Sequence, residues 1–149
     1  MTNNEKNTAT IVHLSTLSQY IIPFGNYIFP TIIWSAKKDD SEFINQTGKN
    51  VLNFQLSIFL YSVLLLIIAV PLLIFTILKN KNFELFFDGN HNFEFLQHQQ
   101  SSGLIISFII AVFLIVLLKV TEFILIVKGA LIASEGQLYR YPLSLNFIK

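Results

Sequence analysis

The sequence predicts an all-α integral membrane protein, a helical bundle in which two long transmembrane helices follow a helical segment broken by proline and glycine. Of the 149 residues, 53% are hydrophobic and only 13% are charged, whereas a soluble domain carries about a quarter charged residues. The stretches 7–36, 50–78 and 95–118 contain no Asp, Glu, Lys or Arg. Each is long enough for a helix that crosses the ~30 Å hydrocarbon layer.

The same composition excludes several classes of protein. There is no cysteine, which excludes a disulfide scaffold and a zinc module with cysteine ligands. The net charge is only +1, and no basic stripe marks a nucleic-acid binder. We therefore expect the partners to be the lipid bilayer and other membrane protein subunits, in a hetero- or homo-oligomer, and no nucleic acid.

The first apolar segment, residues 8–38, is interrupted by polar residues, and three residues break it: Pro23, Gly25 and Pro30. One interpretation is a single kinked span that ends at Trp34. The other is a pair of short helices, about Thr8–Ile22 and Asn26–Lys38, that turn at Pro-Phe-Gly. A cleavable signal peptide fits less well, because Glu5 precedes the apolar stretch and the stretch itself is interrupted.

The two clear spans are Val51–Leu78 and residues 104–133. In lipid an apolar backbone must be helical, because no water is present to bond its amides. Pro71 lacks an amide donor and is expected to kink the first of these helices. At 28 residues this helix would be about 42 Å long, so it must tilt, kink or project from the bilayer.

The basic residues predict the topology within a bacterial inner membrane. Positive residues near the ends of spans stay in the cytoplasm. The loop 37–50 and the C-terminal part each hold three, whereas the loop 79–103 holds two. We therefore expect the loop 37–50 and the tail 134–149 to be cytoplasmic and the loop 79–103 extracytoplasmic, all within one membrane domain, 1–149. The side of the N-terminus stays open.

The last span carries small residues along one of its faces. At 100° per residue, a set of positions falls within about 120° of the helix: Gly103, Ser107, Ala111, Glu122, Gly129 and Ala133. Small residues let membrane helices approach closely. We expect this face to pack on another helix, either within the monomer or between subunits.

Several polar side chains lie within the apolar segments. Lys119 and Glu122 are spaced i, i+3 and can pair on the helix surface, although an intramembrane acid can also mark an ion path. Four others crowd the start of the first clear span: Asn50, Asn53, Gln55 and Ser57. We expect these to bond the broken backbone around Pro23, Gly25 and Pro30; a polar substrate vestibule is the alternative.

Catalytic and metal-binding motifs are weak or missing. His91, Glu94 and His98 have helical spacing, but two histidines are few for a zinc site, and we expect a solvated loop. No H-E-x-x-H motif or glycine-rich phosphate loop occurs. We therefore predict no catalytic, cofactor or metal residues. Aromatic residues next to cations predict interfacial anchors at headgroup level: Trp34, Tyr139, Arg140 and Tyr141.

Three stretches together carry a family resemblance: HLSTLSQYIIPFGNYIFPTIIWSAKKDDSEF, INQTGKNVLNFQLSIFLY and EGQLYRYPLSLNFI. They resemble small bacterial membrane proteins of unknown function related to the Tic-twenty subunit of the chloroplast inner-envelope import translocon. The resemblance implies an all-helical bundle with both termini on one side. It supplies no catalytic residues, and it links the chain to protein translocation only by fold-level analogy.

These observations predict a small, non-enzymatic inner-membrane protein that acts as an accessory or assembly subunit of a larger membrane complex. The small-residue face, the short soluble parts and the lack of catalytic groups support this prediction. The alternative is a channel or protein-translocation component that acts as a homo-oligomer. It requires a polar path that involves Asn53, Gln55, Ser57 or Glu122.

Overall fold

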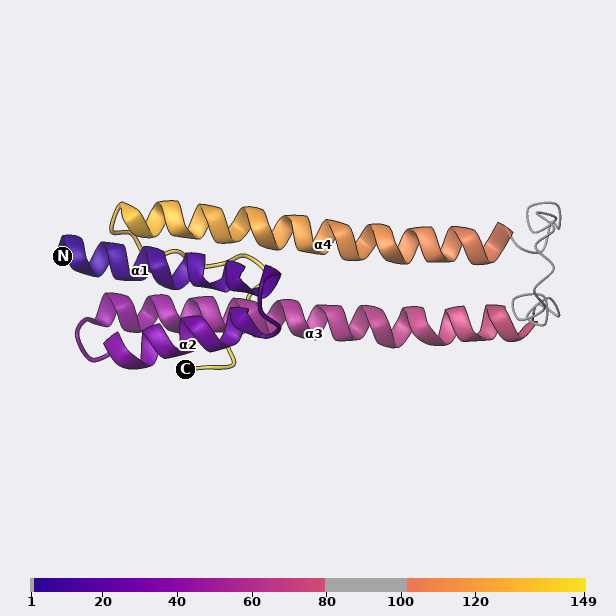
Figure 1. The fold of residues 1–149 in the computed structure, drawn as a ribbon, viewed down its shortest axis with the longest axis horizontal. Coiled ribbons are helices and arrows are strands. Elements are labelled where there is room, and N and C mark those ends of the chain that lie inside the picture. Colours follow the sequence, from indigo (N-terminus) through magenta and orange to yellow (C-terminus); the bar gives the residue numbers. More distant parts are fainter. Residues whose placement is uncertain (1, 80–101) are drawn as a thin grey trace. The chain divides into compact units, whose positions relative to one another are not determined.

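The computed structural model describes residues 2–79 and 102–149, and within them every regular element is helical (Figure 1). The elements are α1 (Asn3–Ser15), η1 (Thr16–Tyr20), α2 (Gly25–Lys37), α3 (Glu42–Lys79) and α4 (Ser102–Ser134). By length and composition, two helices could cross a membrane, over Glu42–Pro71 and Ile106–Ser134. The predicted fold class is confirmed. Most of the loop 79–103, with His91, Glu94 and His98, lies outside the described residues.

The first segment is two helices with a turn between them. A capping box starts α1: the Thr2 hydroxyl accepts from the Glu5 amide, and the Glu5 carboxylate accepts from the Thr2 amide. This cap explains why α1 begins at Asn3, five residues before the expected start at Thr8. Residues 16–20 form the 3-10 helix η1, and the chain then turns before α2.

Glycine is required where α2 begins. A Cβ atom on Gly25 would lie 2.6 Å from the Ser18 hydroxyl and 2.9 Å from the Ser18 backbone, so α2 starts in direct backbone contact with η1. The preceding residue, Phe24, has φ 62°, a left-handed conformation that favours glycine. Pro23 lies in the same turn, so Pro23 and Gly25 mark the chain reversal.

Pro30 and Pro71 do not end helices. Pro30 lies inside α2, and Pro71 lies inside α3. The prediction that Pro30 breaks the first segment was therefore wrong. A proline removes one amide donor, and both helices nevertheless continue past it. Membrane helices tolerate this loss where neighbouring groups compensate for it.

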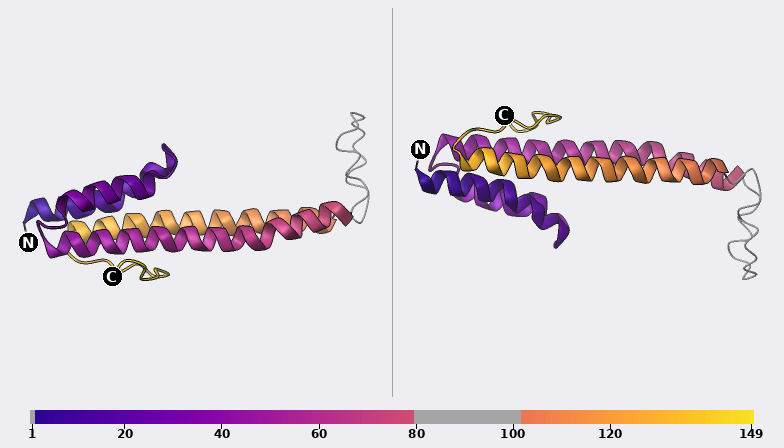
Figure 2. Two further views of the ribbon diagram at one scale, coloured as in Figure 1. Left: turned by 90° about the horizontal axis from the view of Figure 1, so that it is seen from below. Right: turned by 90° about the horizontal axis from the view of Figure 1, so that it is seen from above.

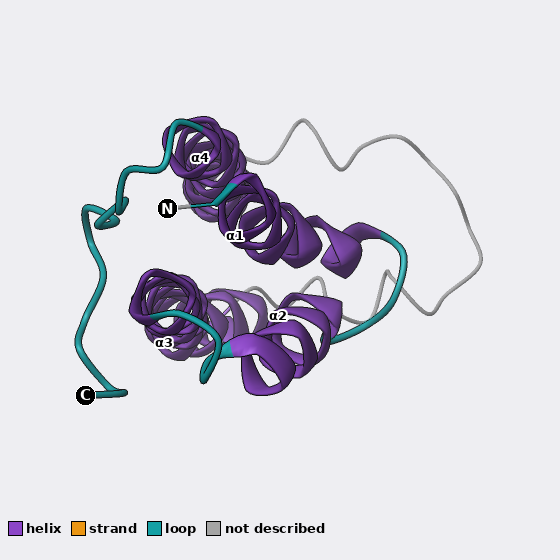
Figure 3. Cartoon of the chain, turned by 90° about the vertical axis from the view of Figure 1, so that its left-hand side faces the viewer, coloured by secondary structure: helices purple, strands orange, loops and turns teal. Residues whose placement is uncertain are grey.

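The chain divides into two compact units, and unit 1 comprises Met1–Leu60 and Leu118–Lys149. It contains the α1–α2 hairpin, the first part of α3, the last part of α4, and the non-helical tail that follows. Within unit 1 the hairpin lies on one side of α3 and α4, and the tail crosses their other side (Figures 2 and 3). The core includes Ala9, Val12, Phe54, Ile126 and Ala133.

Unit 2 comprises Tyr61–Leu117, in which segments of α3 and α4 lie side by side (Figure 1). They enclose an apolar groove of about 170 Å³, whose lining includes Ala69, Ser107 and Ala111. Two of the predicted small residues of α4, Ser107 and Ala111, therefore lie against α3. Gly103 lies outside the residues whose surroundings are described.

Candidate functional site

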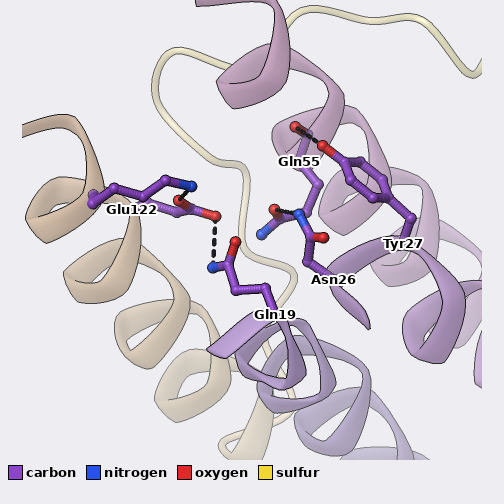
Figure 4. A network of polar contacts seen from close by, with 6 residues as sticks. Gln19, Asn26, Tyr27, Gln55 and Glu122 are labelled. Carbon is purple, nitrogen blue, oxygen red and sulfur yellow. Dashed lines mark hydrogen bonds and ion pairs between the residues drawn. The ribbon is translucent and has the colours of Figure 1, made fainter. Parts of the chain in front are cut away.

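The buried carboxylate of Glu122 forms the first part of a polar cluster in unit 1 (Figure 4). One oxygen lies 2.8 Å from the Lys119 ammonium, and the other accepts a hydrogen bond of 3.0 Å from the Gln19 amide. The i, i+3 pairing anticipated for Lys119 and Glu122 is present in the structure. A buried carboxylate is costly unless it is paired and hydrogen-bonded, and these two contacts supply that compensation.

The second part of the cluster joins α2 to α3. The Asn26 amide donates to the Gln55 side-chain oxygen at 2.7 Å, and the Tyr27 hydroxyl donates to the Gln55 backbone carbonyl at 3.2 Å. The other end of the Gln55 amide, Nε2, is buried and has no hydrogen-bond partner. In Figure 4 the Gln19 and Gln55 amides point toward one another. Such a donor is suited to bind a buried water.

A third group joins α1 to the tail. His13 Nδ1 lies 2.6 Å from the Tyr141 hydroxyl, and the Tyr141 ring stacks on Phe54 at a centroid distance of 4.0 Å. Gly129 of α4 permits this approach, because a Cβ atom there would lie 2.8 Å from His13 Nδ1 and 2.9 Å from the Tyr141 hydroxyl. The predicted packing role of Gly129 therefore acts inside the monomer.

His13 and Tyr141 are both buried in their neutral forms. His13 lies in α1, outside the two helices that could cross a membrane, and burial lowers its pKa to about 4. Burial also raises the pKa of the Tyr141 hydroxyl, because desolvation disfavours the charged form of either group. His13 Nε2 has no hydrogen-bond partner. The pair thus serves packing at neutral pH and carries no charge.

The tyrosines are not the interfacial anchors that the sequence predicts. Tyr139 and Tyr141 are buried, and their rings meet edge-to-face at 4.8 Å. Arg140, between them, is exposed. Alternation along an extended tail explains the difference, because successive side chains point to opposite sides. Trp34 is half-buried; its ring packs on Gly48 and its Nε1 donates to Asn45 Oδ1 at 3.2 Å.

The polar residues at the start of the α3 apolar run hold the tail. The Asn53 side chain accepts from the amides of Phe147 and Ile148 and donates to the Ile148 carbonyl. Ser57 accepts from the Leu145 amide, and Asn50 donates to the Tyr139 carbonyl. The expectation that these residues bond the backbone around Pro23, Gly25 and Pro30 was wrong for Asn50, Asn53 and Ser57. It was also wrong in detail for Gln55, whose side chain bonds to α2 through the Asn26 side chain and not through the backbone.

The tail explains why most of these polar side chains do not bond the first segment. Residues 137–149 form no helix or strand, so their amides and carbonyls need side-chain partners where they meet the bundle. Sequence reasoning also missed Gln19 and Asn26 as partners of Glu122 and Gln55. The signal for both was present, because each is a polar side chain inside the apolar first segment.

The fold and these buried contacts define a class: a small helical integral membrane protein whose polar interior joins its own helices. Across 2–79 and 102–149, no group of three or more His, Cys, Asp or Glu could hold a metal ion. The chain belongs to MamF/MmsF, the magnetosome magnetite crystal formation protein family, whose model matches residues 4–148. No curated protein and no solved structure matches it.

The family match corrects the resemblance drawn from the sequence. The chain belongs to the magnetosome family and not to a Tic-twenty-like family. The three stretches that carried the resemblance are short, and they combine an apolar background with proline, glycine and aromatic residues. Helical membrane proteins of different families share this composition. The link to protein translocation therefore loses its basis.

Proposed function

We propose that this protein is a non-enzymatic membrane component that takes part in magnetite crystal formation as an accessory or assembly subunit beside other membrane proteins. The observation that carries the proposal is the family match over residues 4–148. The structure supports the proposal because the buried polar groups of unit 1 bond to other parts of the same chain. Glu122, Asn53 and Gln55 contact other parts of the same chain, as in a packing core.

The exposed surface supports a role within the bilayer. In unit 2 the large apolar side chains point outward, among them Ile67, Ile68, Phe108 and Phe113, each more than half exposed. Such a surface is stable only against lipid or other membrane helices. An accessory subunit would offer this surface to its partners. We further propose that the segment 37–50, whose residues from Glu42 onward form the start of α3, and the tail are cytoplasmic, and that the loop 79–103 is extracytoplasmic.

The chain offers a clean test of that topology. It has no cysteine, so single-cysteine variants report one position each. In intact cells, Asn90→Cys should react with an impermeant maleimide, and Ser41→Cys should react only after the cells are opened. The reverse pattern would overturn the topology but leave the proposed function standing.

The function is tested in a magnetite-forming bacterium that lacks its own members of this family. Expression of the wild-type chain should restore the size distribution of magnetite crystals seen by electron microscopy, and gentle detergent extraction should recover it with other membrane proteins. Lys37→Gln, which removes an exposed ion pair with Asp40, serves as a control and should restore crystals equally. Normal membrane insertion with no change in the crystals would refute the proposal.

A channel that acts as a homo-oligomer is the second candidate. It is favoured by the buried Glu122 and by the unpaired Gln55 Nε2. Liposomes that contain the purified protein should then show ion flux, and Glu122→Gln or Asn53→Leu should reduce it. Equal flux in all three proteins would remove this candidate.

A further inference from the structure

A polar cavity of about 380 Å³ lies in unit 1 between the start of α3 and the tail. Three of the residues that line it are cations: Lys49 of α3, and Arg140 and Lys149 of the tail. No acidic residue lines it. Among the residues that the structure describes, none of these three cations takes part in an ion pair. The cavity therefore carries a net positive charge, and the acid that interacts with Lys49 electrostatically, Glu42, does not line it.

Specific contacts hold the cations around this cavity. Arg140 is fixed between two buried residues, Tyr139 and Tyr141, and Asn50 binds the Tyr139 carbonyl at 3.0 Å. Lys149 follows Ile148, whose amide and carbonyl both bond to the Asn53 side chain. Lys49 lies one turn of α3 before Asn53 and is half-buried. Residues about 90 positions apart in sequence are thus joined by part-buried hydrogen bonds.

The position of the cavity along the spans indicates its ligand. Lys49 belongs to the charged first part of the candidate span Glu42–Pro71 and directly precedes the uncharged run 50–78, so it marks the level at which α3 meets lipid headgroups. Clustered Lys and Arg at this level bind phosphate oxygens through charge-assisted hydrogen bonds. Ser144 and Asn146 also line the cavity and can donate further hydrogen bonds.

We propose that the cavity bounded by Lys49, Arg140 and Lys149 binds the phosphate of an anionic phospholipid headgroup. This site goes beyond the proposed function, because an accessory role in crystal formation does not require a bound lipid. It would fasten the tail to the membrane surface at the same place where Asn53 fastens it to α3.

Native mass spectrometry of the full chain in detergent tests the site. Wild-type protein titrated with phosphatidylglycerol should retain bound lipid, and it should bind phosphatidylcholine far more weakly. The triple variant Lys49→Gln, Arg140→Gln, Lys149→Gln should bind phosphatidylglycerol at least about tenfold more weakly, because each cation near an anionic surface contributes to binding. Circular dichroism should show unchanged helix content in this variant, because the three side chains lie outside the core.

A charge-matched control separates the cavity from net charge. Lys6→Gln, Lys38→Gln, Lys128→Gln removes three cations that do not line the cavity and should change phosphatidylglycerol binding less than twofold. Equal loss in both triple variants would overturn the proposal, as would unchanged binding in the cavity variant. Displacement of the lipid by millimolar inorganic phosphate would overturn the assignment to a lipid and identify a site for a soluble phosphate.

Discussion

The two halves of α4 are both largely apolar, but they have opposite surroundings. From Ile106 to Leu117, in unit 2, every side chain is exposed or half-exposed. From Leu118 onward, in unit 1, the helix buries Glu122, Ile126 and Ala133 completely. The α3 helix shows the same contrast, since residues 51–55 are all buried whereas Leu66, Ile67 and Ile68 are exposed. The hydropathy of these helices therefore predicts insertion but not burial.

The difference is explained by what covers the helices in unit 1. There the α1–α2 hairpin and the tail pack on α3 and α4, and their polar groups bond across the contacts, as His13 does with Tyr141. In unit 2 the apolar helices leave their outer surfaces to lipid. Lipid solvates leucine as well as a protein core does, so directional contacts specify structure in unit 1. Four experiments can sharpen or break this comparison.

The largest effect is expected from acidification. Burial lowers the pKa of His13 from 6.5 to about 4, so between these pH values the unfolded chain binds a proton that the folded chain does not. The contribution of neutral His13 to the free energy of unfolding is therefore fully present above pH 6.5. It falls as the pH drops toward 4, by about 3 kcal/mol in all. Unfolding in detergent from pH 7 to pH 4 measures it.

The matched control for this pH dependence is His13→Phe, which keeps an aromatic ring at the site. The variant should show a flatter dependence of stability on pH. Residues 62–78 and 106–117 of unit 2 carry no ionisable side chain. If His13→Phe keeps the wild-type slope, the titrating group lies elsewhere and the contrast between the units is weakened.

The next largest effect is expected at Asn53. Replacement by Leu removes three hydrogen bonds to the tail, and at roughly 1 kcal/mol net for each bond it should cost about 2 to 3 kcal/mol. Limited proteolysis should then cut the tail faster than in the wild type. Asn50→Leu removes one such bond, and its tail should be cut at a rate between those of the wild type and Asn53→Leu. Equal cleavage of all three proteins would show that the tail is held by other contacts.

A smaller effect follows from adding bulk to a small residue of α4. Gly129→Val would push a Cβ atom against His13 and Tyr141, and overpacking of this kind costs about 2 kcal/mol. Ala111→Val, in unit 2, should change thermal stability by less than about 0.5 kcal/mol. Comparable losses at both positions would mean that unit 2 is packed as tightly as unit 1.

The smallest effect is expected from neutralising the buried acid. Glu122→Gln keeps an oxygen that can accept from Gln19 but loses the ion pair with Lys119. Because the Lys119 side chain is 44% exposed, the loss should be about 1 kcal/mol. Lys37→Gln removes an ion pair exposed on both sides and should cost less. The opposite order would show that the burial of Glu122 adds nothing to its pairing with Lys119.

Local sequence signals predicted much of the fold. Uncharged runs predicted both long helices, although α3 begins at Glu42, nine residues before the expected Val51. Pro23 and Gly25 indicated the chain reversal. Both kinds of signal work because turns and lipid-facing helices depend on neighbouring residues. The i, i+3 spacing of Lys119 and Glu122 indicated their pairing for the same reason. The predicted start of α1 was too late in the sequence, because the Thr2 cap was overlooked.

The partners of the polar groups could not be predicted in this way. Asn53 bonds residues 94 and 95 positions further along the chain, and no periodicity in the sequence encodes such a pairing. The alternation of Tyr139, Arg140 and Tyr141 is equally compatible with a membrane surface and with a core. Only the path of the tail across α3 and α4 decides between these alternatives.

The contact between His13 and Tyr141 spans 128 positions, and this separation has a consequence for biosynthesis. The ribosome must complete both long helices before Tyr141 exists to meet His13. Until then, the Phe54 ring, on which Tyr141 stacks, lacks part of its final covering. Closure of unit 1 is therefore a late, post-insertion event, because non-local contacts form only after the intervening chain is in place. A released chain that ends shortly before Tyr141 would form an inserted but open bundle.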